Sequence, residues 1–104
     1  MTGTVRVFKI FTADQWAALN HDGVFAGSAD DLRDGYIHMS AEPELAGTIA
    51  KHFPLQSGLV IAEIAIDRFG ATLKWESARG DKLFPHLYEP ILLADVIRSD
   101  VSDR

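Results

Sequence analysis

Residues 34–40, with the sequence DGYIHMS, restrict the fold more than any other stretch of this 104-residue chain. Successive side chains of a β-strand point to opposite faces, so a strand here places Ile37 and Met39 on one face, where they can anchor it in a core. The opposite face carries three side chains with polar groups: Tyr36, His38 and Ser40. Such a face is costly to bury against apolar side chains. We therefore expect a strand with one face on a core and the other on a functional site.

Residues 84–88, with the sequence FPHLY, repeat this construction. In a strand Leu87 points to one face, and Phe84, His86 and Tyr88 share the other. Each of the two stretches thus carries a histidine and a tyrosine two residues apart on one face. This pattern predicts a site, but by itself it does not specify the chemistry of that site.

The first strand and the first helix are expected near the N-terminus. Residues 5–10 predict a strand, in which the basic residues Arg6 and Lys9 indicate the edge of a sheet. Thr12 is expected to cap the helix that follows, and Gln15, three residues later, completes a capping box.

The connection at residues 24–33 is rich in charged groups, and Ser28 can begin one capped helical turn within it. Charged side chains are mostly found in contact with solvent, so we interpret the charged group in and just after this connection as surface. The group consists of Asp30, Asp31, Arg33 and Asp34.

The remaining elements follow from periodicity. Residues 42–53 predict a second helix, because Leu45, Ile49 and Phe53 are spaced to form one buried stripe. Residues 59–66 are almost continuously aliphatic and predict a central strand that is buried on both faces. Further strands are expected at residues 72–76, 83–88 and 91–101.

Early helices followed by a run of strands favour an α+β fold. We expect a curved, mostly antiparallel sheet with two main helices in the N-terminal half of the chain. The length of 104 residues is that of one domain, so a single domain over residues 1–104 is expected.

Composition argues against several classes of protein. The chain has no cysteine, which excludes disulfides and thiolate metal sites. Its net charge is −5 and it has no basic cluster, which argues against strong non-specific binding to nucleic acid. No apolar run is long enough to span a membrane, and the first residues lack the pattern of a signal peptide. A cytoplasmic location is expected, and the oligomeric state stays open.

His38 is the first candidate for chemistry. A strand histidine beside other polar groups can bond a ligand hydroxyl or act as an acid or base. The structural alternative is a hydrogen bond from His38 to a backbone carbonyl. Ser40 has a competing role of its own, because it is well placed to cap the helix that follows.

His86 and Tyr88 are the second candidates, because a tyrosine near a histidine can stack on an aromatic ligand and donate a hydrogen bond. The alternative is an amphipathic pair at a sheet edge. Glu76, one loop away from Arg79, is either a catalytic carboxylate or half of a surface ion pair. Spacing does not choose between Glu76 and two other carboxylates: Glu63 and Glu89.

A metal site is not favoured. His38, His52, His86 and a glutamate would have to supply the ligands, and the chain lacks local ligand spacings such as H-x-x-x-H. Signatures of P-loop, Rossmann and α/β-hydrolase sites are also absent from the sequence. Trp75 is expected to belong to the core.

The chain resembles a small bacterial family catalogued as domain of unknown function 952. The resemblance covers almost the whole sequence and depends most on the motifs DGYIHMS and FPHLY, with Trp75-Glu76 and Arg79-Gly80 between them. The family has no established activity. Its members look like compact α+β domains, and the resemblance implies an ADP-ribosyltransferase-like fold.

A remoter similarity links residues 36–40, the helix ending at Lys51-His52 and the apolar strand after it to the RNA 2′-phosphotransferases. In that fold the strand histidine commonly contacts the nicotinamide ribose of NAD. The resemblance implies that His38 contacts the ligand with Ser40 beside it, and that Arg79 lies in a site-like loop. It also implies that the nicotinamide side is lined by Tyr36, Tyr88 or His86. Lys51 stands where those enzymes have an arginine.

Two hypotheses follow. The first is an NAD-using or ADP-ribose-related transferase or hydrolase, in which Glu76, His86 and Tyr88 orient nicotinamide or stabilise an oxocarbenium-like centre. The second is a non-catalytic domain that binds a nucleotide or another small ligand in the same cleft. A third interpretation is a structural or partner-binding domain without a small-molecule site, in which His38 and His86 are buried in backbone hydrogen bonds and do not line one cleft.

Overall fold

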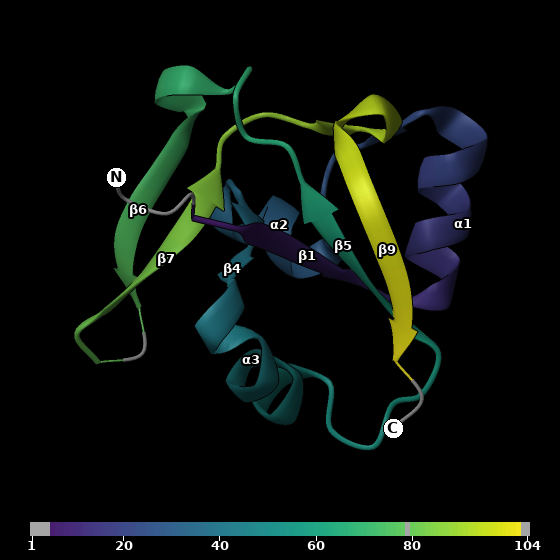
Figure 1. Ribbon diagram of the computed structural model, residues 1–104, viewed down its shortest axis with the longest axis horizontal. Coiled ribbons are helices and arrows are strands. Elements are labelled where there is room, and N and C mark those ends of the chain that lie inside the picture. Colours follow the sequence, from purple (N-terminus) through teal and green to yellow (C-terminus); the bar gives the residue numbers. More distant parts are fainter. Residues whose placement is uncertain (1–4, 79, 103–104) are drawn as a thin grey trace.

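The computed structural model describes residues 5–78 and 80–102, so Arg79 lies outside the described residues. One four-stranded sheet forms the centre of the molecule (Figure 1). Its strands, in spatial order, are β4 (Ser40–Ala41), β1 (Val7–Phe11), β5 (Leu59–Ile64) and β9 (Val96–Ser102). β5 is therefore an interior strand, as its aliphatic sequence predicts.

Two smaller sheets complete the β-structure. One has the order β3 (Ile37–His38), β7 (Lys82–Leu87) and β6 (Leu73–Ala78), and the other pairs β2 (Val24–Phe25) with β8 (Ile91–Leu92). Every strand pairing within the described residues is antiparallel. The predicted α+β class with mostly antiparallel sheets is confirmed, but the strands form three sheets rather than one.

The helices are α1 (Ala13–Asp22), α2 (Ala29–Asp34) and α3 (Leu45–His52), and short 3₁₀ turns occupy Glu42–Glu44, Gly70–Thr72 and Leu93–Asp95. The capping box predicted for α1 is present, since the Thr12 hydroxyl accepts from the Gln15 backbone and the Gln15 side chain accepts from the Thr12 backbone. The turn predicted after Ser28 extends into α2. α2 places acidic residues beside the sheets.

The main core draws on all three sheets. Val7 and Val60 come from the four-stranded sheet, Leu87 from the three-stranded sheet and Ile91 from the two-stranded one. A second cluster beneath α3 contains Ile49, Ile10 and Leu59. Figure 1 shows the β6–β7 hairpin to one side of the central sheet, with α3 below it and α1 at the opposite side.

The DGYIHMS stretch is not one strand, as predicted, but two strands in different sheets. Ile37 pairs with Leu87 of β7, whereas Ser40 pairs with Phe8 of β1. Between them the Met39 amide donates to the Pro85 carbonyl at 3.1 Å. The stretch therefore joins the two larger sheets, a pairing that alternation within one strand cannot reveal.

Two further expectations are wrong. β1 is not a sheet edge, because it lies between β4 and β5, and Lys9 is only 6% exposed. Trp75 is not a core residue: it lies on β6, at the edge of its sheet, and is 38% exposed. Within the described residues, no helix combines the length and apolar character needed to cross a membrane.

Candidate functional site

The antiparallel pairing of β3 with β7 brings the two histidine–tyrosine stretches together. His38 and His86 are direct cross-strand partners, and their ring centroids are 5.8 Å apart. Tyr36 stacks on the His86 ring at 4.1 Å and lies 4.6 Å from the His38 ring. Tyr36 also lies 5.3 Å from Tyr88. The two stretches therefore lie side by side and not on opposite faces of the molecule.

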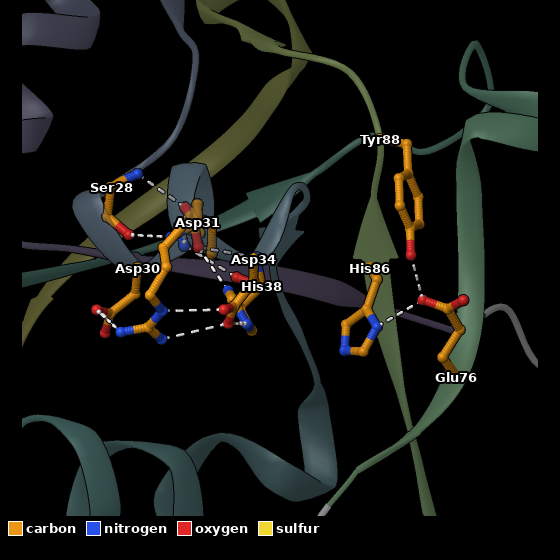
Figure 2. Close-up of polar contacts among 10 residues, drawn as sticks. Ser28, Asp30, Asp31, Asp34, His38, Glu76, His86 and Tyr88 are labelled. Carbon is orange, nitrogen blue, oxygen red and sulfur yellow. Dashed lines mark hydrogen bonds and ion pairs between the residues drawn. The ribbon is translucent and has the colours of Figure 1, made fainter.

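His38 is held between two carboxylates of α2 (Figure 2). Its Nδ1 lies 2.7 Å from Asp31 Oδ1, and its Nε2 lies 3.0 Å from Asp34 Oδ2. An ionised carboxylate can only accept a hydrogen bond, so both contacts are hydrogen bonds only when both ring nitrogens carry a proton. The two contacts fix the orientation of the His38 ring.

Asp31 is the centre of this network and is 2% exposed, which corrects its interpretation as surface. Lys9 Nζ donates to Asp31 Oδ2 at 3.1 Å and to the His38 carbonyl at 2.9 Å. The backbone amides of Ser28 and His38 donate to the same carboxylate at 2.9 and 3.1 Å. Each Asp31 oxygen therefore accepts more than one hydrogen bond.

These contacts decide the charges of the buried pair. Burial alone raises the pKa of Asp31, but the hydrogen bond from His38 and the charge of Lys9 outweigh it and hold that pKa far below the ordinary carboxyl range. Burial lowers the pKa of Lys9, and the attraction of Asp31 opposes this effect. The geometry is that of an ionised Lys9–Asp31 pair.

A second polar cluster lies on the β6–β7 hairpin. His86 Nδ1 and the Tyr88 hydroxyl each lie 2.8 Å from Glu76 Oε1 (Figure 2). Hydrogen bonds from Tyr88 and His86 lower the pKa of Glu76, and the same bond to Glu76 raises the pKa of Tyr88. Within the described residues, His86 Nε2 has no hydrogen-bond partner, and Figure 2 shows it turned away from Glu76. Glu76 thus orients the His86 ring through Nδ1.

A cavity of about 400 Å³ opens beside the two histidines. Its polar wall includes His38, His86 and Ser40, and its apolar wall includes Phe84 and Phe53. This volume lies within the range of about 300–1,000 Å³ typical of small-molecule sites. Tyr36 and Tyr88 do not line it. They line a smaller cavity of about 200 Å³ instead.

Ser40 does not cap the following helix, because Ala41 is the cap residue and provides no side-chain bond. The Ser40 hydroxyl instead lies 3.0 Å from the Thr48 hydroxyl at the wall of the cavity. The other carboxylates left open by spacing are engaged elsewhere. Glu63 bonds to Arg6 at 3.1 Å, and Glu89 contacts Arg68 at 2.8 Å.

The described residues contain no group of three or more histidine, aspartate or glutamate side chains arranged to hold a metal ion. They do contain two functional candidates that sequence reasoning missed, Lys9 and Asp31. A lysine inside the apolar run VFKIF, and an aspartate at the third position after Ser28, were the available signals. Each signal marks a residue that needs a partner, but neither identifies the other as that partner.

Comparisons with known proteins identify the family of this chain. The family model "Protein of unknown function (DUF952)" matches residues 10–99, so the chain belongs to that family. It is similar to the crystal structure of protein CC0527 from Caulobacter crescentus, with 42% identity, a TM-score of 0.88 and coverage of 92% of this chain and 84% of that one. The solution NMR structure of CC0527 gives 42% identity, a TM-score of 0.83 and coverage of 94% and 84%. No curated protein matches the chain significantly.

Proposed function

We propose that the chain binds an NAD- or ADP-ribose-like nucleotide in the larger cavity and acts on its ribosyl bond by hydrolysis or transfer. The observation that carries the proposal is the Glu76–His86 pair, whose histidine forms part of the cavity wall. A carboxylate that holds one nitrogen of a histidine leaves the other nitrogen to act as a base, which is a recurring arrangement in enzymes.

In this proposal His86 Nε2 takes the proton of a water molecule or of an acceptor hydroxyl. The oxygen of that acceptor forms a bond to the ribose C1′ as the C1′–nitrogen bond to nicotinamide breaks, and the electron pair of that bond returns to the pyridine ring. Positive charge grows on the ribose in the transition state, and a nearby carboxylate stabilises such charge. Glu76 supplies an ionised carboxylate, because its hydrogen bonds lower its pKa.

The remaining residues take binding roles. His38 and Ser40 hold the ribose, as the similarity to the RNA 2′-phosphotransferases and an ADP-ribosyltransferase-like fold imply. Tyr36 and Tyr88 do not line the larger cavity, so they act on the nicotinamide side through His86, on whose ring Tyr36 stacks. Arg79, which lies outside the described residues, is proposed to contact the ligand.

A specific observation favours a second candidate, a non-catalytic nucleotide-binding domain. Both ring nitrogens of His38 contact carboxylates, at 2.7 and 3.0 Å. A histidine held in this way can position a ligand by contact with its ring edge, but it has no nitrogen left for proton transfer. Under this alternative the cavity binds its ligand and releases it unchanged.

NMR titration with NAD and ADP-ribose tests binding, and the appearance of free nicotinamide in the same samples tests catalysis. We expect saturable amide shifts at residues 36–40 and 84–88 and slow release of nicotinamide. Glu76→Gln should retain binding and reduce the rate about 100-fold or more, the size of a typical acid–base contribution. His21→Ala is the matched control, because this histidine is exposed at the end of α1.

The outcomes separate the candidates. Binding without nicotinamide release would select the non-catalytic domain. The absence of shifts at millimolar nucleotide, in protein whose spectrum shows it to be folded, would refute both. Release of nicotinamide at an unchanged rate by Glu76→Gln would remove the Glu76 carboxylate from the mechanism.

A further inference from the structure

Strand β9 is an open edge of the central sheet. Within the described residues it pairs only with β5, and Figure 1 shows it along the outer side of the sheet. Ile97 and Val101 on this strand are 53% and 63% exposed. An edge strand presents unpaired N–H and C=O groups, which makes it a template for pairing with another strand.

The sequence of β9 is complementary to itself. Arg98 and Asp100 flank Ser99, so an antiparallel copy centred on Ser99 places each arginine opposite the aspartate of the other copy. The same register sets Ile97 opposite Val101. Opposite charges and apolar pairs directly across two strands are stabilising, whereas like charges in these positions are destabilising.

Asp100 can take part in such pairing directly, whereas Arg98 would share its charge between Asp100 of the other copy and Glu63 of its own sheet. Asp100 makes no ion pair within the described part of the chain. Arg98 contacts Glu63 at 3.3 Å, and Glu63 is also bonded by Arg6. From Arg98 to Ser102 the pairing with β5 is regular, since the register shift of this ladder lies between Glu63 and Ile64. The second copy would therefore meet a regular segment of strand.

We propose that two copies of the chain pair through antiparallel β9 strands about a two-fold axis at Ser99. Their central sheets then form one continuous sheet. The interface is isologous, so Arg98 of each copy meets Asp100 of the other. This proposal does not depend on the proposed function, because β9 contributes no residue to either cavity.

Analytical ultracentrifugation of the full chain, from micromolar to millimolar concentration, tests the proposal. The wild type should show a concentration-dependent monomer–dimer equilibrium. Asp100→Arg places like positive charges opposite each other, and Arg98→Asp places like negative charges there. Each variant alone should weaken dimerisation about tenfold or more, because two symmetric pairs are lost.

The decisive experiment is ultracentrifugation of the two variants mixed together. In a mixed dimer both pairs are again opposite in charge, so the mixture should dimerise more strongly than either variant alone. Val101→Lys, which removes the apolar contact, should also weaken the dimer. Val5→Lys is its matched control, because Val5 is 53% exposed and lies outside β9. Circular dichroism checks that each variant is folded.

Three results would overturn the proposal. They are a wild type that stays monomeric at every concentration, a dimer unaffected by Asp100→Arg, and a mixture that does not restore association. A dimer that dissociates only with Trp75→Glu would instead assign the interface to β6, the exposed edge of the three-stranded sheet.

Discussion

At the scale of single residues, the buried Lys9–Asp31 pair is the most unusual feature of the chain. Two charges with 6% and 2% exposure are stable together only when each is paired and hydrogen-bonded. Asp31 meets this condition with four donors from three segments: Lys9 on β1, the amide of Ser28 before α2, and the amide and ring of His38 on β3. One carboxylate thereby joins α2 to both larger sheets.

Asp31→Asn should lower the free energy of unfolding by about 3–5 kcal/mol, because it leaves the Lys9 charge buried without its partner. Urea denaturation measures the change. The adjacent Asp30→Asn is the matched control. Asp30 is exposed, its ion-pair partner among the described residues is Arg33, and the change should alter stability by less than about 0.5 kcal/mol. Equal effects of the two variants would contradict the role assigned to Asp31.

The same variant has a pH signature. The folded-state pKa of Asp31 is lowered, so its ionised form stabilises the fold at pH values above the ordinary carboxyl pKa of about 3.9. This contribution is lost as the pH falls below that value. The stability difference between wild type and Asp31→Asn should therefore shrink on acidification, and a difference that stays constant would argue against an ionised Asp31.

At the scale of elements, short local signals begin and end the helices. Thr12 and Ser28 cap α1 and α2 with reciprocal capping boxes, and each helix ends at a glycine in the left-handed region, Gly23 with φ 78° and Gly35 with φ 88°. α2 is only six residues long, yet it supplies both carboxylates that hold His38. Its stability therefore affects the site directly.

Thr12→Ala should destabilise the protein by about 1 kcal/mol, because the amide at the third position of α1 loses its acceptor. For a chain of this length that corresponds to a fall in Tm of roughly 4–8 °C, measurable by calorimetry. Thr12→Ser keeps the hydroxyl and should leave Tm nearly unchanged. A serine variant as unstable as the alanine variant would show that the methyl group of Thr12, and not the cap, is important.

At the scale of the whole molecule, the three sheets share one core. Leu87, fully buried on β7, belongs to the same cluster as Val7 on β1 and Ile91 on β8. A core shared in this way couples the sheets, so we expect them to unfold together. The β3–β7 pairing that forms the site depends on this core, since Ile37 opposite Leu87 is also buried in it.

Leu87→Ala should lower the free energy of unfolding by about 2–5 kcal/mol. It should shift the unfolding transitions of the three sheets equally. Hydrogen exchange in the presence of denaturant follows amides in each sheet separately. Leu83→Ala, on the same strand but exposed, should cost less than about 0.5 kcal/mol. A loss of protection confined to the β6–β7 hairpin would show that this hairpin unfolds independently.

Local patterns in the sequence were sufficient to predict most helices and strands and part of the candidate site. The capping box of Thr12, the stripe of α3 and the aliphatic run of β5 depend on neighbours within a few residues, and each appears in the structure. The two histidine–tyrosine stretches were recognisable for the same reason. Alternation places His38 and Tyr36 on one face whatever the rest of the chain does.

Which residues contact one another across the fold is determined only by the tertiary structure. Lys9 looked like an edge residue and Asp31 like surface, because a charged side chain is costly to bury unless a partner meets it, and sequence spacing does not name a partner 22 positions away. The split of residues 37–41 between two sheets, the exposure of Trp75 and the pairing of Glu76 with His86 follow from strand pairing in the same way. Local periodicity sets which face a side chain occupies, and long-range pairing sets what that face meets.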